Sequence, residues 1–285
     1  MNKICIFKHL LYKSTFILLL IFQSGLAQSP KGKLFIIGGG NRSDQLMKTL
    51  LTAAAMQNKD YIVVLPMSSE EPDSAFFYFK KQVEKLTKQQ IVMLNFDKTK
   101  TSNFVWIDSL QKAKLIFISG GDQSRFMNIV AKTPVYDAIH KAFKNGSTIA
   151  GTSAGAAVMS EHMITGNQKL NAKYVETFNS IQFDNLETSK GLGLIKNVII
   201  DQHFLKRSRF NRLISALIEF PSHIGIGIDE GTAILVSNKT IEVVGESEVI
   251  VLKNPIKIVK SKTNNLVSVQ NISMRILIAG ERFNF

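Results

Sequence analysis

The feature that most constrains the fold is a series of short, unbroken apolar segments separated by stretches with helical spacing. These segments are residues 34–37, 61–65, 91–94, 115–118 and 147–150. They do not alternate apolar with polar residues, which is typical of strands buried on both faces. Between them, residues 44–57 and 76–86 place apolar side chains at helical spacing. The pattern predicts an α/β fold, with a mostly parallel, doubly wound sheet covered by helices on both faces.

The C-terminal third has a different pattern of closely spaced β segments. They are residues 224–228, 232–236, 240–244 and 249–253, and the turns Ser237-Asn238 and Gly245-Glu246 separate some of them. Such spacing predicts antiparallel strands that extend the sheet at its edge, without forming a second domain. Beyond about residue 260 the pattern is weak, apart from a strand-like segment at 276–278. We therefore expect one domain over residues 28–285.

The first 27 residues have the pattern of a secretory signal peptide. Basic residues precede a short apolar run at 16–22, and Gly25 and Ala27 are small residues at positions −3 and −1 of a cut after Ala27. The alternative is an uncleaved membrane anchor, but a spanning helix needs about 20 apolar residues. We expect export to the periplasm or the medium, with no stable membrane insertion after cleavage. The only cysteine, Cys5, lies in this leader, so the mature chain would have neither a disulfide nor a cysteine nucleophile.

The positive charge of the chain admits several kinds of partner. Lys and Arg number 35 against 22 Asp and Glu, a net charge of +13, of which three lysines lie in the leader. Nucleic acid, an anionic membrane surface and an acidic substrate are all compatible with this balance. The basic segment 206–212 contains only one aromatic residue, Phe210, and follows a candidate catalytic histidine. Guanidinium groups there would bind a substrate carboxylate through two hydrogen bonds. We therefore favour an acidic peptide over nucleic acid, and a basic surface-binding protein is the least favoured alternative.

A candidate nucleophile follows the strand at 147–150. The chain continues as Gly151-Thr152-Ser153-Ala154-Gly155, and residues 156–163 then have a helical pattern. G-x-S-x-G between a strand and a helix is typical of a tight turn that exposes the serine hydroxyl. The N-terminus of the following helix would supply backbone N–H groups that stabilise an oxyanion. The alternative is a small-residue turn in which Ser153 only caps the helix.

A serine hydroxyl needs a base, and His203 is the candidate that the pattern favours. It comes directly after the buried segment 198–202, so it should lie at the same edge of the sheet as Ser153. The alternative is a histidine that merely packs in the core. The other histidines of the mature chain are less suitable, because they fall within predicted helices or in a loop: His140, His162 and His223.

Two glycine-rich segments end other predicted strands. At Gly120-Gly121-Asp122-Gln123 the Gly121 N–H would be a second oxyanion donor, and Gln123 would hold the substrate backbone; the alternative is a plain turn. The triplet 38–40 is not G-x-G-x-x-G, and no acidic residue ends the second strand, so the sequence does not predict a dinucleotide cofactor. No cluster of His, Asp and Glu has metal-ligand spacing either, and we expect no cofactor and no metal.

These motifs together resemble the cyanophycinase-like serine peptidases, which are related to the aspartyl dipeptidases. They occur in family order over nearly the whole mature chain, at residues 38–40, 120–123, 151–159, 191–194, 201–212 and 227–233. The resemblance implies a class I glutamine-amidotransferase-like fold. It also implies a serine exopeptidase that acts on β-linked Asp-Arg units or related aspartyl peptides, and it makes a homodimer plausible.

The resemblance also implies roles for individual residues. Ser153 would be the nucleophile, His203 the base, and the backbone N–H groups of Gly121 and Ala154 the oxyanion hole. The positions that match the family's substrate pocket are Gln123, Asp201, Gln202, Arg207, Arg209 and Arg212. An Asp-Arg substrate would offer carboxylates to the arginines and a guanidinium to Asp201.

The third member of the catalytic triad is the weakest part of the match. The resemblance implies an acid in the segment after the helix that follows Ser153, where residues 163–168 offer an amide such as that of Gln168 and no carboxylate. The next acids along the chain are Glu176, Asp184 and Glu187, and we favour Glu176 because the loop before residue 191 is long enough to bring it to His203. Asp229 and Glu230 are interpreted as part of a structural turn. An amide would stabilise the charged imidazole less well, so a catalytically weakened peptide-binding relative is the alternative function.

Overall fold

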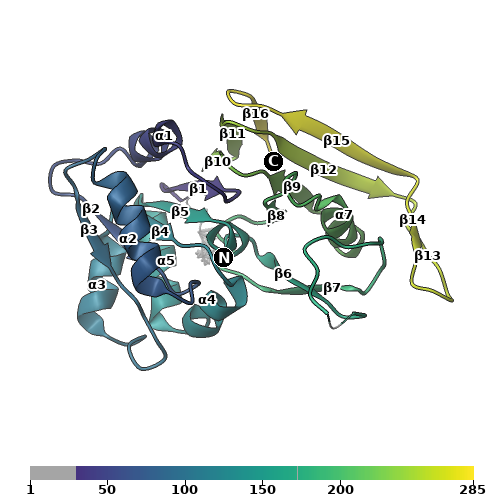
Figure 1. The fold of residues 1–285 in the computed structure, drawn as a ribbon, viewed down its shortest axis with the longest axis horizontal. Coiled ribbons are helices and arrows are strands. Elements are labelled where there is room, and N and C mark those ends of the chain that lie inside the picture. The colour runs from purple at the N-terminus through teal and green to yellow at the C-terminus, as the bar shows by residue number, and fades with distance from the viewer. Residues whose placement is uncertain (1–29, 172) are drawn as a thin grey trace, which may run out of the picture.

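The computed structural model describes residues 30–171 and 173–285, so the predicted leader lies outside the described residues (Figure 1). The larger sheet has the strand order β16-β11-β10-β1-β5-β4-β2-β3. Its parallel part is β1 (Lys33–Ile37), β2 (Tyr61–Leu65), β3 (Gln90–Met93), β4 (Leu115–Ile118) and β5 (Thr148–Thr152). Its antiparallel part is β10 (Thr232–Ser237), β11 (Thr240–Gly245) and β16 (Arg282–Asn284). This confirms the mostly parallel sheet with antiparallel C-terminal strands.

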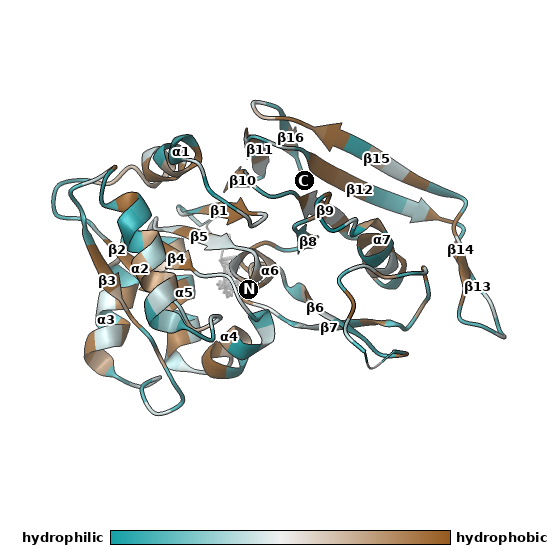
Figure 2. Cartoon of the chain, in the orientation of Figure 1, coloured by the Kyte–Doolittle hydropathy of each residue, from teal (hydrophilic) through white to brown (hydrophobic). Residues whose placement is uncertain are grey.

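Helices cover both faces of this sheet, as the doubly wound pattern predicted. One face packs against α1 (Asp44–Ala54) and α2 (Pro72–Val83), with Leu50 and Phe79 in its core. The other packs against α3 (Phe104–Lys112), α4 (Gln123–Val130) and α5 (Pro134–Asn145), with Phe126 and Ile139 buried there. Each large apolar side chain buried in this way stabilises the fold by about 1.5–3 kcal/mol. Figure 2 shows the apolar colouring along β1 and β2, the strands between these layers.

We had expected all of the C-terminal strands to extend the first sheet, and this prediction is wrong for β9 (Ile224–Ile228) and β12 (Val249–Ile256). They belong to a second sheet with the order β15-β12-β9-β8, whose other strands are β8 (Val198–Gln202) and β15 (Asn271–Leu277). Its β9 pairs in parallel with β8, and α7 (Phe210–Glu219) packs on it. Close spacing along the chain indicates hairpins, but it does not show that β9 pairs with β8, in which Val198 lies opposite Ile224. Two small hairpins complete the fold: β6 (His162–Gln168) with β7 (Leu186–Lys190), and β13 (Val259–Lys260) with β14 (Val267–Ser268).

The predicted helix at 156–163 is wrong. Helix α6 (Ala154–Ala157) has four residues, and β6 begins at His162. Every residue from Ala154 to Ser160 is buried, so the apolar run has no polar face from which a helical period could be read. The main chain of this segment instead bonds to a distant loop, where the Leu192 N–H donates to the Val158 carbonyl at 2.7 Å.

The loop after β1 holds together the carboxyl ends of β5 and β8, which belong to different sheets. The Ser153 N–H donates to the Ile37 carbonyl at 3.1 Å, and the His203 N–H donates to the Gly38 carbonyl at 2.7 Å. The carboxyl ends of β5 and β8 therefore meet at one place, where ligands bind in open α/β sheets. Among the described residues, no helix combines the length and hydropathy needed to cross a membrane.

Candidate active site

Ser153 occupies a strained turn between β5 and α6. Its backbone angles are φ 53° and ψ −110°, a conformation that is rare for a residue with a side chain. The turn also requires close approach of neighbouring segments, because a Cβ on Gly155 would lie 2.3 Å from the Ile118 carbonyl oxygen. Strain of this kind persists where the surrounding structure fixes it, often at functional sites. The arrangement is that of the predicted nucleophile turn.

His203 lies beside Ser153, at the distance that a general base requires. Its Nε2 is 2.8 Å from the Ser153 Oγ. The residue follows β8 directly, has a positive φ of 49° and is 8% exposed. The ring packs on the backbone of Gly39, where a Cβ would come within 2.3 Å of the imidazole. A side chain at Gly39, in the glycine triplet 38–40, would therefore clash with the His203 ring.

Glu230 is the acid that contacts the histidine. Its Oε1 is 2.5 Å from His203 Nδ1. The pairing of β8 with β9 explains the contact, because Gln202 lies opposite Ile228 and the residues just after both strands become neighbours. The Gly231 N–H donates to the Gly39 carbonyl at 3.0 Å and holds the turn in place. Its neighbour Asp229 does have the structural role that we had expected of both acids, since its carboxylate accepts from the Lys206 N–H and from the Ser247 hydroxyl.

The prediction of Glu176 as the third member of the triad is therefore wrong. Its carboxylate lies 3.3 Å from a terminal nitrogen of Arg207, in an exposed ion pair. The other candidates are also engaged away from His203: Asp184 with Lys169, Glu187 with Asn167 and Gln168 with Asn185. The loop between β6 and β7 lies elsewhere, because its Tyr174 lines the cavity beside Ser153 and its Thr177 hydroxyl donates to the Arg207 carbonyl at 2.7 Å.

The environment of His203 favours the neutral imidazole. Burial lowers its pKa below the ordinary value, the hydrogen bond to Glu230 raises it, and the nearby Arg207 and Arg209 lower it. The net effect is a lowered pKa. At neutral pH the ring is therefore unprotonated and able to accept the proton of the Ser153 hydroxyl.

Two backbone N–H groups near Ser153 have no acceptor within the part of the chain that the structure describes. They belong to Gly121 and to Ala154, the first residue of α6. The loop that carries Gly121 is fixed by the next residue, because the Asp122 N–H donates to the Ser68 carbonyl at 2.8 Å. These are the two donors that the sequence predicted for the oxyanion hole, and that role stays a prediction.

A cavity of about 330 Å³ opens beside Ser153. Most of the predicted substrate-binding residues line it: Gln123, Gln202, Arg207, Arg209 and Arg212. The Gln123 amide nitrogen donates to the carbonyls of Ile164 and Thr165 at 2.9 and 2.6 Å, which fixes the side chain against β6. Asp122 is the one acid among the lining residues. The cavity is therefore strongly positive, as the sequence indicated.

Asp201 does not reach this cavity, contrary to our expectation. Its carboxylate receives two hydrogen bonds from Arg212, one of them 2.9 Å long, and lies 3.7 Å from Arg209. The side chain of Asp201 is fully buried. A carboxylate already paired in this way has no free face for a substrate guanidinium, and it fixes the direction of Arg212 instead. Removing one partner of a buried ion pair typically costs about 3–5 kcal/mol, so the arginines depend on this acid.

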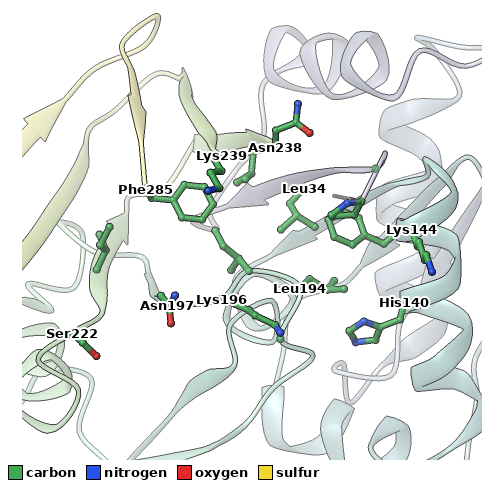
Figure 3. A pocket seen from close by; sticks show the side chains of 17 residues that line it. Leu34, His140, Lys144, Leu194, Lys196, Asn197, Ser222, Asn238, Lys239 and Phe285 are labelled. Atoms are coloured by element: carbon green, nitrogen blue, oxygen red, sulfur yellow. The ribbon is translucent and has the colours of Figure 1, made fainter. Parts of the chain in front are cut away.

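Another cavity, of about 840 Å³, is at the opposite ends of the strands (Figure 3). It lies at the start of β1 and β9, between Leu34, Ile224 and Phe285. None of the predicted catalytic or substrate-binding residues lines it. Here the His140 ring is hydrogen-bonded to the Leu192 carbonyl at 2.8 Å, as a packing residue. Within residues 30–171 and 173–285, no three His, Cys, Asp or Glu side chains come together as a metal site.

Comparisons with known proteins agree with the motif pattern. The model of Peptidase family S51 matches residues 34–244. Cyanophycinase from Trichormus variabilis is 39% identical over 183 residues, which cover 62% of this chain and 58% of that protein. Cyanophycinase from Synechococcus elongatus is 32% identical over 203 residues, 68% of this chain and 59% of that protein. The matched part thus spans less than two thirds of these relatives.

Solved structures show the same fold. A peptidase from an acI-B1 Actinobacterium superposes with a TM-score of 0.66 at 23% identity, covering 89% of this chain and 97% of that one. A putative peptidase E from Listeria monocytogenes EGD-e gives a TM-score of 0.52 at 17% identity, over 76% of this chain and 99% of that one. These likenesses show that the chain shares the α/β fold of these two peptidases, which is consistent with the predicted class I glutamine-amidotransferase-like fold. Because the family model matches well over half of the sequence, this chain belongs to peptidase family S51, the cyanophycinase-like family that its motifs resemble.

Proposed function

We propose that this protein is a serine peptidase that hydrolyses aspartyl peptides, including β-linked Asp-Arg units, through an acyl-enzyme on Ser153. The observation that carries the proposal is the hydrogen-bonded line Ser153–His203–Glu230, whose Ser153 also lines an arginine-lined cavity. The names of the cyanophycinase relatives support the same class of substrate. The alternative of a catalytically weakened relative rested on a missing acid. Glu230 supplies a carboxylate, so the site no longer favours that alternative.

In the first step, the Ser153 Oγ attacks the carbonyl carbon of the scissile amide. His203 Nε2 accepts the hydroxyl proton, and Glu230 holds the ring with its Nδ1–H towards the carboxylate. The carbonyl oxygen gains negative charge and is stabilised by the N–H groups of Gly121 and Ala154. The tetrahedral intermediate then collapses. Its C–N bond breaks, and Nε2 gives the proton to the departing amine.

In the second step, water takes the place of that amine. His203 removes a proton from the water as its oxygen attacks the ester carbonyl, and a second tetrahedral intermediate forms. Its bond to the Ser153 Oγ breaks, the serine regains a proton from Nε2, and the acid product leaves. The same imidazole thus acts as base and then as acid in each half of the reaction.

The arginine-lined cavity suits an acyl group that carries both signs of charge. Arg207, Arg209 and Arg212 would bind carboxylates, and Asp122 would attract a guanidinium. This combination matches an Asp residue with arginine joined to its side-chain carboxyl. A plain aspartyl group would use only the arginines.

Peptides that differ in one charge test this proposal. In the first peptide, the acyl side of the scissile bond is an Asp whose side-chain carboxyl is joined to an arginine with a free α-carboxylate. The second peptide is identical except that this α-carboxylate is an amide. Loss of the carboxylate should reduce kcat/KM by about 10- to 100-fold, because a hydrogen bond to a charged group is worth about 1.5–3 kcal/mol. Product release followed by chromatography gives both rates. Absence of turnover on every aspartyl peptide would contradict the proposed function.

We also propose that residues 1–27 direct export and are removed after Ala27. The support is the pattern of the leader in the sequence. Sequencing the N-terminus of the protein recovered from cells should find Gln28 first, whereas a chain that still begins at Met1 would refute cleavage. The single domain over residues 28–285 and the homodimer stay predictions.

A further inference from the structure

A second cavity, of about 220 Å³, lies on the other side of Ser153. Ser153 lines both cavities, but His203 lines only this smaller one and Gly121 only the arginine-lined one. The smaller cavity is formed by the loop after β1, by α2 and by the end of β4: Gly39, Gly40, Arg42, Ala75, Tyr78, Phe117, Ser119 and Gly120 contribute, with Thr152 beside the nucleophile.

The direction of the proposed reaction indicates which cavity binds the acyl part of the substrate and which binds the departing amine. His203 must deliver its proton to the departing amine, so that amine leaves on the side that the imidazole lines. The oxyanion donor Gly121 belongs to the other cavity, which therefore holds the acyl part. The smaller cavity is the site of the leaving residue. Its volume is below the roughly 300–1,000 Å³ of pockets for drug-sized ligands, which suits one residue better than an extended chain.

The cation in this cavity is Arg42, and it is unusually buried. The residue is 9% exposed, and its guanidinium lies between two aromatic rings, 5.1 Å from the centre of Tyr78 and 5.3 Å from that of Phe117. Its Nε donates to the side chain of Gln82 at 3.0 Å. These contacts fix the plane of the guanidinium. Burial also lowers the pKa of Arg42, which records the cost of keeping its charge away from water.

No carboxylate balances this charge within the described residues. Arg42 forms no ion pair there, its terminal nitrogens donate no hydrogen bond to the protein, and no Asp or Glu lines the cavity. The other buried arginines of the site differ, because Arg209 and Arg212 both lie against Asp201. A buried cation without a partner is costly, and a ligand that brings an anion relieves the cost.

We propose that Arg42 binds a carboxylate of the departing residue, so that the enzyme cleaves preferentially in front of a residue with a free carboxylate. The inference rests on the proposed function, because it assigns the two cavities by the direction of the Ser153 reaction. A bound α-carboxylate would restrict cleavage to the last peptide bond of a chain. A bound side-chain carboxylate would instead select an acidic residue at that position.

The test uses four peptides that share one acyl part and differ in the departing residue. This residue is Asp, Asn, Asp α-amide or Asn α-amide, so both, one or neither carboxylate is present. We expect the wild type to cleave at least one singly charged peptide about 10- to 100-fold faster, in kcat/KM, than the uncharged one. Preference for the Asn peptide identifies the α-carboxylate, and preference for the Asp α-amide peptide identifies the side chain.

Variants at two arginines decide whether Arg42 is responsible. In Arg42→Gln the ratio of charged to uncharged peptide should fall towards 1, and in Arg42→Lys it should stay above that of the glutamine variant. Arg275→Gln is the matched control, because this exposed arginine on β15 also stacks on an aromatic ring, at 5.6 Å from the centre of Phe283. It should keep the wild-type ratio. Thermal unfolding of each variant shows whether the fold is retained.

The possible outcomes separate this inference from the proposed function. If peptides are cleaved and Arg42→Gln keeps the wild-type ratio, the inference is wrong and the function stands. If no peptide is cleaved, the proposed function fails. In that case calorimetry with aspartate, asparagine, aspartate α-amide and asparagine α-amide as ligands tests the cavity directly. At least one ligand with a carboxylate should then bind about tenfold or more tightly than asparagine α-amide to the wild type but not to Arg42→Gln, and equal binding would overturn the inference.

Discussion

Ser153→Ala is expected to lower kcat by roughly a million-fold, the loss seen when the nucleophile of a serine protease is removed. In the proposed mechanism this hydroxyl forms the covalent bond to substrate, and within residues 30–171 and 173–285 no other side chain is hydrogen-bonded to His203 Nε2, which lies 2.8 Å from the Ser153 Oγ. KM should change little, because the arginines that we propose bind the acyl part are untouched. Steady-state hydrolysis of an aspartyl peptide measures both constants.

Two further measurements make this result specific. Ser189→Ala removes an exposed serine of β7 and should keep the wild-type kcat. Rapid acid quenching of the wild type during turnover should leave the acyl group on the peptide that contains Ser153, as found by mass spectrometry. Activity retained in Ser153→Ala, or an acyl group on another residue, would contradict the acyl-enzyme.

The nucleophile and the base could be predicted because each follows a recognisable strand. Ser153 and His203 both come directly after a buried strand, β5 and β8, and the carboxyl ends of such strands meet at one edge of the fold. The short G-x-S-x-G pattern gained its meaning from this context. The local sequence was therefore sufficient to predict a site residue that directly follows its own strand.

The acid was missed because its position depends on strand pairing. Glu230 lies 27 residues after His203, and it becomes a neighbour only because β9 pairs in parallel with β8. A usable signal was present, since Glu230 also comes just after a buried apolar strand at 224–228. Glu176 was favoured because its loop is long enough to reach His203. The length of a loop does not show in which direction the loop folds.

Charge in the two cavities was predicted only in part. Arg207, Arg209 and Arg212 stand in one basic segment, so their cluster was visible in the sequence. The pairing of Asp201 with Arg212 was not, because it joins β8 to α7 through side chains buried between them. Arg42 stands alone in the sequence, and its significance comes from burial against Tyr78 and Phe117, which lie far along the chain.

Glu230→Gln is expected to reduce kcat by about 10³- to 10⁴-fold, by analogy with loss of the orienting acid in other serine proteases. The amide keeps the shape of the side chain but stabilises the imidazolium less and permits the wrong tautomer. Glu176→Gln is the matched control. It removes an exposed ion pair worth about 0–1 kcal/mol, so its effect should be no more than about fivefold. Steady-state kinetics on one peptide compares the two variants.

The pH profile shows whether Glu230 acts through the histidine. The base works when unprotonated, so kcat/KM rises with pH through the pKa of His203, which burial holds below its ordinary value. The bond to Glu230 opposes that shift, so the glutamine variant should have a still lower pKa and an acid limb displaced to lower pH. In Glu176→Gln the acid limb of the kcat/KM profile should stay at the pH of the wild type. A large loss of activity in Glu176→Gln with a mild one in Glu230→Gln would return the triad to the acid that the sequence first suggested.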